Sequence, residues 1–245
     1  MRRPLIVGNW KMYKTLTEAV EFVHALKSQV AEVLDRDLVV CPPFPALEAV
    51  ANILKGSNLK VGAQNLFWED EGAFTGEVSA PMLKAVGCEY VIIGHSERRQ
   101  YFWETDPVIN KKVFAALKHG LRPIVCVGET SEQRKRDQTF RTIESQIYDG
   151  LKDLTIDQWP LVAIAYEPVW AIGTGKTATP QQAQEVQSFI RKLLPQEVAQ
   201  IVRILYGGSI KPENIKELMA QPDIDGGLVG GASLSLDSFV KIVKY

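Results

Sequence analysis

The strongest chemical feature of the sequence is a carboxylate that directly follows an apolar run. Residues 161–166 are almost entirely apolar, which is typical of a strand buried on both faces of a parallel sheet. Glu167 comes next, so its carboxylate is predicted to stand at the carboxyl end of that strand. A carboxylate in this place could remove a proton from carbon if the pocket around it is dry.

The segment that follows Glu167, residues 169–174, has the composition of a lid. A proline before it ends the strand, and glycines within and after it give the backbone freedom to move. Its side chains Trp170 and Ile172 would be exposed apolar surface unless the segment closes over a ligand. The alternative is an exposed glutamate followed by an ordinary surface loop, and these two side chains favour the lid.

Short runs rich in β-branched residues recur along the chain and alternate with amphipathic segments. Eight such units of about 31 residues fit the 245 residues, close to the size of a minimal βα repeat. The sequence therefore predicts a single-domain (β/α)8 TIM barrel over residues 1–245, with a doubly wound open sheet as the alternative. The predicted strands are 5–7, 38–40, 60–63, 90–93, 123–127, 161–166, 202–206 and 227–229.

Helix signals occur between the predicted strands. Thr15 and Glu18 form a capping-box pattern ahead of an apolar stripe that runs through Ala19, Val23, Leu26, Val30 and Val33. Proline stands in the first turn of predicted helices at 180 and at 212, and residues 118–120 give a cationic last turn with a glycine stop.

Polar residues follow several of the predicted strands. In a parallel barrel the carboxyl ends of all strands open on one face, so residues far apart in the sequence can meet there. The residues in these positions are Asn9 and Lys11 after the first strand, His95, Ser96 and Glu97 after the fourth, Glu167 after the sixth, Ser209 after the seventh, and Gly230 and Gly231 after the eighth.

His95 differs from the other two histidines of the chain. His24 and His119 are interpreted as ordinary surface or helix-end residues, whereas His95 ends an apolar run and precedes the short predicted helix Ser-Glu-Arg-Arg. The dipole at a helix N-terminus disfavours a second proton on the ring. We expect a neutral imidazole that donates a hydrogen bond.

Lys11 lies between Trp10 and Met12, so its charge is predicted to sit in a partly apolar pocket and to need a carboxylate partner. Glu97 is the nearest candidate in the predicted topology. The alternative is that Glu97 pairs with an arginine of its own helix.

Glycines after the seventh and eighth strands suggest a phosphate site. Gly207 and Gly208 precede Ser209, and Gly230 with Gly231 precedes a helix predicted near residue 232. Converging backbone N–H groups and a helix N-terminus bind phosphate, and barrels commonly do so after strands seven and eight. Gly173 in the lid could add another N–H.

The connection over residues 64–79 is long and carries Phe67, Trp68 and Phe74. Loops of this length are usually functional or disordered, and the aromatic side chains argue against disorder. We expect the loop to project into a second copy of the chain, with a loop folded onto its own barrel as the alternative.

The overall composition points to a small-molecule partner. Lys and Arg number 28 against 29 Asp and Glu, for a net charge of −1, with no basic tract for nucleic acid and no apolar stretch long enough to span a membrane. The three cysteines, Cys41, Cys88 and Cys126, offer no zinc spacing. Cys41 and Cys126 end or lie in apolar strands, which indicates buried free thiols in a reducing compartment, and the protein is expected to be cytoplasmic.

Blocks of residues along the whole chain resemble the triosephosphate isomerase family. They are Asn9-Trp10-Lys11-Met12, residues 94–99 (Gly-His-Ser-Glu-Arg-Arg), residues 165–176, residues 206–209 (Tyr-Gly-Gly-Ser) and residues 228–232 (Leu-Val-Gly-Gly-Ala). The match is loose over residues 133–159 and 221–225. No position that carries the chemistry departs from the family pattern.

The resemblance implies an isomerase of glycolysis and gluconeogenesis that interconverts dihydroxyacetone phosphate and D-glyceraldehyde 3-phosphate through an enediolate. Glu167 would be the base, neutral His95 and the Asn9 amide would polarise the carbonyl, Lys11 would supply positive charge, and Glu97 would hold Lys11 or assist from behind. No cofactor or metal is implied, because the proton stays within one molecule.

The resemblance also implies the phosphate ligands and the quaternary structure. Gly173, Ser209, Gly230 and Gly231 would bind the phosphate, and the lid would protect the enediolate from losing it. Family members are usually homodimers in which the third loop reaches the neighbouring site, here with Thr75 near Asn9, Lys11 and Glu97 of the other copy.

Two other functions are compatible with parts of the pattern. Another phosphosugar isomerase could share the phosphate site but would lack this lid. A phosphate-binding scaffold that has lost activity would lack the base, yet Glu167 is present.

Overall fold

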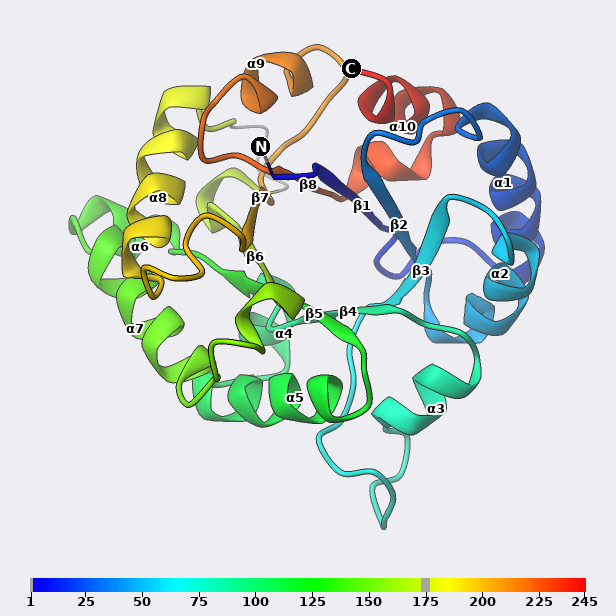
Figure 1. Cartoon of the computed structure of the whole chain (residues 1–245), viewed down its shortest axis with the longest axis horizontal. Coiled ribbons are helices and arrows are strands. Elements are labelled where there is room, and N and C mark those ends of the chain that lie inside the picture. The colour runs from blue at the N-terminus through cyan, green and yellow to red at the C-terminus, as the bar shows by residue number, and fades with distance from the viewer. Residues whose placement is uncertain (1, 173–176) are drawn as a thin grey trace.

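The computed structural model describes residues 2–172 and 177–245. Eight parallel strands form a closed barrel in the order β1 to β8, and helices surround it (Figure 1). The strands are β1 Leu5–Asn9, β2 Asp37–Cys41, β3 Leu59–Ala63, β4 Tyr90–Ile93, β5 Arg122–Val127, β6 Ala163–Tyr166, β7 Arg203–Tyr206 and β8 Gly226–Val229. The predicted single-domain (β/α)8 barrel is confirmed, and the open sheet is wrong.

The ring of helices is built from α1 Leu16–Gln29, α2 Leu47–Leu54, α3 Ala80–Ala85, α4 Ser96–Tyr101, α5 Asp106–Lys118, α6 Ser131–Lys135, α7 Thr139–Leu151, α8 Pro180–Leu193, α9 Ile215–Met219 and α10 Leu236–Val243. Short 3-10 helices occur at Phe44–Ala46 (η1), Trp159–Leu161 (η2), Val169–Ala171 (η3) and Gly231–Leu234 (η4). Of the helices that span a described part of the chain, none is long and apolar enough to cross a membrane.

Alternation along each strand divides the apolar residues into two cores. Leu5 and Val7 of β1 belong to a core with residues of the other strands, whereas Ile6 belongs to the larger core that includes the helices. Successive side chains of a strand point to opposite faces, so the smaller core fills the barrel and the larger one lies between strands and helices. Both faces of the sheet are buried, which explains why the strands are short continuous apolar runs.

The predicted helix ends are partly correct. Thr15 caps α1 in a complete capping box, Thr179 does the same for α8, and α5 ends at Lys118 with Gly120 at φ +69°. The helix expected to begin at Pro212 begins only at Ile215, because turns occupy the residues before it and Asn214 Oδ1 accepts from the N–H of Lys211.

The strand before Glu167 begins two residues later than predicted. The apolar run 161–166 enters the sheet only at Ala163, because Trp159–Leu161 form the 3-10 helix η2 with Pro160 in its first turn. The carboxyl end of the strand is where the sequence placed it, directly before Glu167.

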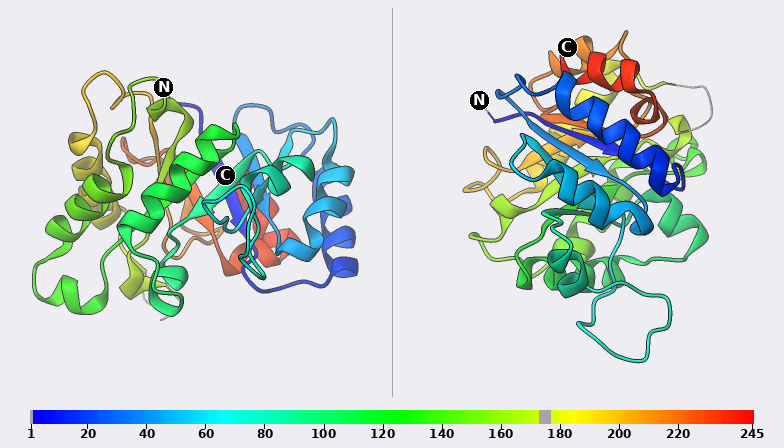
Figure 2. Two further views of the ribbon diagram at one scale, coloured as in Figure 1. Left: turned by 90° about the horizontal axis from the view of Figure 1, so that it is seen from below. Right: turned by 90° about the vertical axis from the view of Figure 1, so that its right-hand side faces the viewer.

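The connection between β3 and α3 leaves the barrel. Residues 71–77 are exposed, and the segment extends beyond the ring of helices below α3 and α5 (Figures 1 and 2). Its base is ordered by stacking of Phe67 on Trp68, with ring centroids 3.9 Å apart, and by Phe74, 4.4 Å from Phe67. The loop therefore projects as predicted. Whether a second copy receives it stays a prediction.

Cys41 and Cys126 are buried free thiols, as expected, and so is Cys88. Burial raises the pKa of Cys88 to about 12, so this thiol is protonated at neutral pH.

Closure of the barrel between its first and last strands depends on Gly226. This residue pairs with Leu5 at φ +153°, and a Cβ atom would lie 1.9 Å from the Leu5 carbonyl oxygen. Gly120 also has a positive φ, +69°, but open space lies around it.

We therefore expect Gly120→Ala to lower the free energy of unfolding by about 1–2 kcal/mol, the cost of a left-handed backbone with a Cβ. Gly226→Ala should lower it by more than about 3 kcal/mol because backbone atoms must also move. Urea unfolding at one protein concentration measures both. Equal losses in the two variants would show that strand closure tolerates the extra carbon.

Candidate active site

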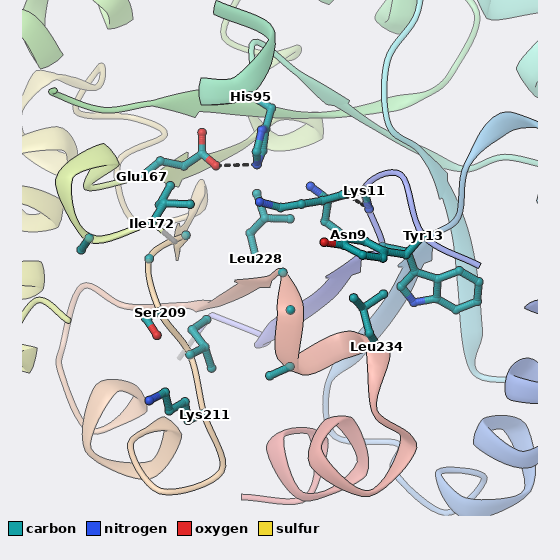
Figure 3. A pocket seen from close by; sticks show the side chains of 18 residues that line it. Asn9, Lys11, Tyr13, His95, Glu167, Ile172, Ser209, Lys211, Leu228 and Leu234 are labelled. Atoms are coloured by element: carbon teal, nitrogen blue, oxygen red, sulfur yellow. Dashed lines mark hydrogen bonds and ion pairs between the residues drawn. The ribbon is translucent and has the colours of Figure 1, made fainter. Parts of the chain in front are cut away.

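A cavity of about 380 Å³ opens at the carboxyl ends of the strands. Residues after β1, β4, β6, β7 and β8 line it, and Figure 3 shows their side chains converging on one space. Of the residues singled out from the sequence, the cavity is lined by Asn9, Lys11, His95, Glu167, Ser209, Gly230 and Gly231.

Glu167 is almost completely buried, with 2% of its surface exposed. Its Oε1 lies 2.9 Å from His95 Nε2 (Figure 3). Its Oε2 accepts a hydrogen bond of 2.8 Å from the backbone N–H of Ser96. Burial raises the pKa of Glu167, but the contacts with His95 and Ser96 oppose it, and the net pKa is lowered. The group is thus a carboxylate at neutral pH.

Room for this carboxylate comes from Gly207 at the end of β7. A Cβ on Gly207 would lie 2.9 Å from Cγ of Glu167, closer than side-chain carbons normally pack. The sequence suggested these glycines only as phosphate ligands, and the structure adds that one of them makes space for Glu167.

His95 stands at the N-cap of α4. Its Nδ1 accepts a hydrogen bond of 3.2 Å from the backbone N–H of Glu97, so this nitrogen carries no proton and the neutral ring is protonated at Nε2. The Nε2–H then points at Glu167. This assignment rests on the hydrogen-bond pattern.

That the helix N-terminus keeps His95 neutral stays a prediction, and in the ligand-free protein other groups also act on the pKa of the ring. Burial lowers that pKa, but the carboxylates of Glu167 and Glu97 together raise it by more. A second proton would sit on Nδ1, which then could no longer accept from the Glu97 N–H. The nearest carboxylate oxygen on that side is Glu97 Oε2, 3.5 Å from Nδ1. The hydrogen bond therefore favours the neutral ring, while the two carboxylates favour the cation.

Lys11 is held in an unusual backbone conformation, with φ +53°. Asn9 Oδ1 accepts from the Lys11 N–H at 3.0 Å, and Gln64 Nε2 donates to the Lys11 carbonyl at 2.8 Å. A left-handed lysine is costly unless its surroundings fix it. The side-chain amides of Asn9 and Gln64 hold this backbone conformation, from which the Lys11 side chain lines the cavity.

The predicted pairing of Lys11 with Glu97 is present, with 2.5 Å between Nζ and Oε1. The arginines that offered an alternative are paired elsewhere, Arg98 with Glu104 and Arg99 with Asp106. Only one neighbour of Lys11 shields it as expected: Trp10 is fully buried, but Met12 is 93% exposed.

The glycine-rich side of the cavity is formed by residues after β7 and β8. Ser209 lies there with Gly230 and Gly231, and η4 begins at Gly231. This is a 3-10 helix, and α10 begins only at Leu236, later than the helix predicted near residue 232. Lys211, which sequence reasoning missed, also lines the cavity next to Ser209 (Figure 3). Its position two residues after a suspected phosphate ligand could have identified it.

The first part of the predicted lid is a 3-10 helix, Val169–Ala171. Trp170 is half-buried, and its Nε1 donates a hydrogen bond of 2.8 Å to Glu129 Oε1, which also accepts from Tyr166 and pairs with Arg134 at 2.8 Å. Ile172 lines the cavity. Gly173 and Thr174 lie outside the described residues.

Sequence reasoning missed Glu129, although it follows the end of β5 by two residues. Its position after a strand was the available signal. Its role as the anchor of Trp170 depends on contacts with three other side chains and has no local signature.

Thr75 is exposed on the projecting loop and does not line the cavity of its own chain. Within residues 2–172 and 177–245, no three His, Cys, Asp or Glu side chains gather in a way that could hold a metal ion.

Fold and cavity together define a (β/α)8-barrel enzyme equipped to move a proton on a small anionic substrate. A statistical model of the family "Triosephosphate isomerase" matches residues 4–245. The chain is 61% identical to the triosephosphate isomerase of Endomicrobium trichonymphae, over 100% of this chain and 99% of that one, and 60% identical to that of Carboxydothermus hydrogenoformans over the same shares. The chain belongs to the triosephosphate isomerase family.

The carboxylates around His95 lead to a titration prediction. In the ligand-free protein, Glu167→Gln should lower the pKa of His95, because it removes the negative charge that stabilises the imidazolium. Glu97→Gln should lower it too, by less. NMR titration of the His95 ring measures both shifts.

Glu144→Gln serves as a control, because Glu144 is an exposed residue of α7. It should leave the His95 titration unchanged. A His95 pKa that is the same in the Glu167→Gln variant and the original protein would contradict the proposed coupling.

Proposed function

We propose that the cavity interconverts dihydroxyacetone phosphate and D-glyceraldehyde 3-phosphate by proton transfer through an enediolate. The observation that carries this proposal is the buried Glu167 carboxylate, 2.9 Å from a histidine N–H donor in the cavity that Lys11 also lines. The whole-length match to the triosephosphate isomerase family supports the same reaction.

Glu167 acts as the base. Its carboxylate removes a proton from the carbon next to the carbonyl and returns it to the neighbouring carbon, so one group serves both half-reactions. To reach the substrate it must give up its contacts with Ser96 and His95. The bound substrate then takes over the Nε2–H of His95, and the carboxylate becomes a stronger base as it loses two donors.

His95, Asn9 and Lys11 stabilise the enediolate. The Nε2–H of His95 donates to the substrate oxygen on which negative charge develops, and the Lys11 ammonium lowers the energy of the same charge. Glu97, bound to Lys11 Nζ on one side and to His95 Nδ1 through its N–H on the other, keeps both groups in place.

Ser209, Gly230 and Gly231 bind the phosphate through backbone N–H groups, and Gly173 of the lid adds a further donor. Lys211 adds positive charge at the edge of this site. Closure of residues 169–174 would then exclude water, which protects the enediolate from expelling phosphate.

The reaction moves a proton within one molecule and changes no net oxidation state, so we propose that neither metal nor cofactor takes part. The site resides in a cytoplasmic enzyme of glycolysis and gluconeogenesis, consistent with three free thiols.

Substitution of the base tests the mechanism. Glu167→Gln should lower kcat/KM for glyceraldehyde 3-phosphate by at least about 10²–10⁴-fold, the usual contribution of a general base. Glu167→Asp should retain more activity, because it keeps the carboxylate but retracts it by one carbon. A coupled assay measures both, with Glu144→Gln as the surface control. Unchanged turnover in Glu167→Gln would remove the base and leave a phosphate-binding scaffold as the better function.

We propose further that the enzyme is a homodimer. The loop between β3 and α3 projects beyond the barrel (Figure 2), and Thr75 on this loop is exposed. Large apolar side chains are also exposed after β1 and α4, with Met12 at 93% and Trp103 at 82%. A second chain would remove this apolar surface from water and would place Thr75 against its Asn9 and Lys11.

Thr75→Arg tests the dimer. In a single chain Thr75 is exposed, so an arginine there should cost little stability, whereas in the proposed interface it would be forced into the partner's site. Light scattering should report two chains for the original protein and one for the variant, with a fall in kcat/KM. Glu144→Arg on α7 is the control for added charge. An active monodisperse monomer of the original protein would contradict the proposal.

A further inference from the structure

A second cavity, of about 520 Å³, lies among the amino ends of the strands, away from the isomerase site. Arg3 precedes β1, Arg122 is the first residue of β5, and Arg203 is the first residue of β7. Together with Arg2 they line the cavity, and none of its lining residues is a carboxylate. The remaining lining residues are Pro160, Gln200 and Ile201.

Two of these arginines share one carboxylate. Arg3 Nε lies 2.7 Å from Asp37 Oδ1, and Arg203 Nη1 lies 2.6 Å from Asp37 Oδ2. Asp37 therefore balances only one of the two positive charges. Arg203 also keeps only a long contact, 3.5 Å, between Nη2 and the Tyr90 hydroxyl, which leaves donor capacity for a ligand.

Arg122 is the third source of charge. Within the described part of the chain, no carboxylate lies within ion-pair distance of its guanidinium and no hydrogen bond engages it. It is exposed and lies 5.9 Å from the centre of the Tyr90 ring. All five of its N–H donors can meet an anion.

Arg2 contributes no free charge. It is paired with Asp225 at 2.5 Å, and its other nitrogens donate to Gln200 and to the Pro222 carbonyl. Asp225 also pairs with Arg191, and Arg191 with Asp223, so these two arginines face two carboxylates.

The pairs next to the cavity are balanced as well. Lys60 lies 3.0 Å from Glu89, and Arg36 lies 2.7 Å from Asp35. One unbalanced charge from the Arg3–Asp37–Arg203 group and one from Arg122 remain, a surplus of two positive charges in a chain whose net charge is −1.

The cavity also has an apolar wall. Ile201 is 55% exposed and stands with the exposed Pro160 beside the arginines. A flat organic group can lie on these two side chains while phosphate oxygens receive the guanidinium N–H groups, which suit phosphate in a forked geometry.

We propose that this cavity binds a small organic diphosphate, of which a nucleoside diphosphate is the simplest example. Its phosphates meet Arg3, Arg122 and Arg203, and its flat ring lies on Pro160 and Ile201. The site is separate from the isomerase cavity, because it is built from the amino ends of the strands and the other from the carboxyl ends.

Calorimetric titration of the full-length protein with ADP tests the proposal. Saturating dihydroxyacetone phosphate is present throughout, so that the isomerase cavity is occupied, and the buffer has about 0.1 M salt to suppress weak non-specific attraction. We expect submillimolar binding at one site per chain. Inorganic pyrophosphate should bind at least several-fold more weakly, because it lacks the ring.

Arg122→Gln should weaken ADP binding by at least fivefold, since it removes a charged donor that has no other partner. Ile201→Glu should weaken it as well, by placing a carboxylate at the apolar wall. Arg136→Gln, at an exposed arginine after α6, is the matched control and should bind ADP as the original protein does. Isomerase activity should persist in all three variants, which verifies that they are folded.

Absence of ADP binding up to millimolar concentration, or equal binding by the Arg122→Gln and original proteins, would overturn the site. Equal affinities for pyrophosphate and ADP would overturn the organic part of the assignment. A loss of ADP binding in the Arg136→Gln control equal to that in Arg122→Gln would show that binding follows net charge and would overturn the site as well.

Discussion

The site depends on keeping one buried carboxylate charged. A charge removed from water costs several kcal/mol unless partners replace the lost hydration, and Glu167 is 2% exposed. Its partners are the Ser96 N–H and the His95 ring, and Ser96 stands 71 residues earlier in the chain. The parallel barrel brings the carboxyl ends of β4 and β6 to one rim. The contacts that keep Glu167 ionised in the empty site must break before its carboxylate can reach a substrate. In the empty site the base is therefore fully hydrogen-bonded, by partners that a substrate can replace.

The strands were predictable because each is short, apolar and buried on both faces, and all eight predicted runs overlap observed strands. Residues after the strands were predictable from topology, since a parallel barrel sends all carboxyl ends to one rim. Gln64 and Glu129 were not, because each acts through contacts with residues distant in the sequence: Gln64 with the Lys11 carbonyl, Glu129 with Trp170. Local pattern does not specify such partners. The late starts of β6 and α9 likewise follow from local turns: the 3-10 helix with Pro160 before β6, and the Lys211–Asn214 turn before α9.

The charge state of His95 depends on side chains from across the barrel as well as on its own helix. Its place before a helix was predicted, and its Nδ1 does accept from that helix N-terminus. Yet burial lowers the pKa of the ring, and two carboxylates near it raise that pKa by more. One of them, Glu97, approaches because it is the second residue of that helix; the other, Glu167, arrives from across the barrel. When Glu167 moves toward a substrate, the ring loses the contact that favours its cation, and the neutral donor needed for catalysis is favoured again.

The two ends of the barrel differ in how their charged side chains are paired. At the carboxyl rim, Lys11 and Glu97 form a matched pair next to the reacting groups. At the amino rim, balancing each charge with a partner would be enough for stability, and most pairs there follow that rule. The group around Asp37 does not, because one carboxylate serves Arg3 and Arg203 while Arg122 stands unpaired within the described residues. Like charges gathered at a rim repel one another and lower stability unless an anion joins them. The proposed diphosphate would supply the negative charge that Asp37 alone does not.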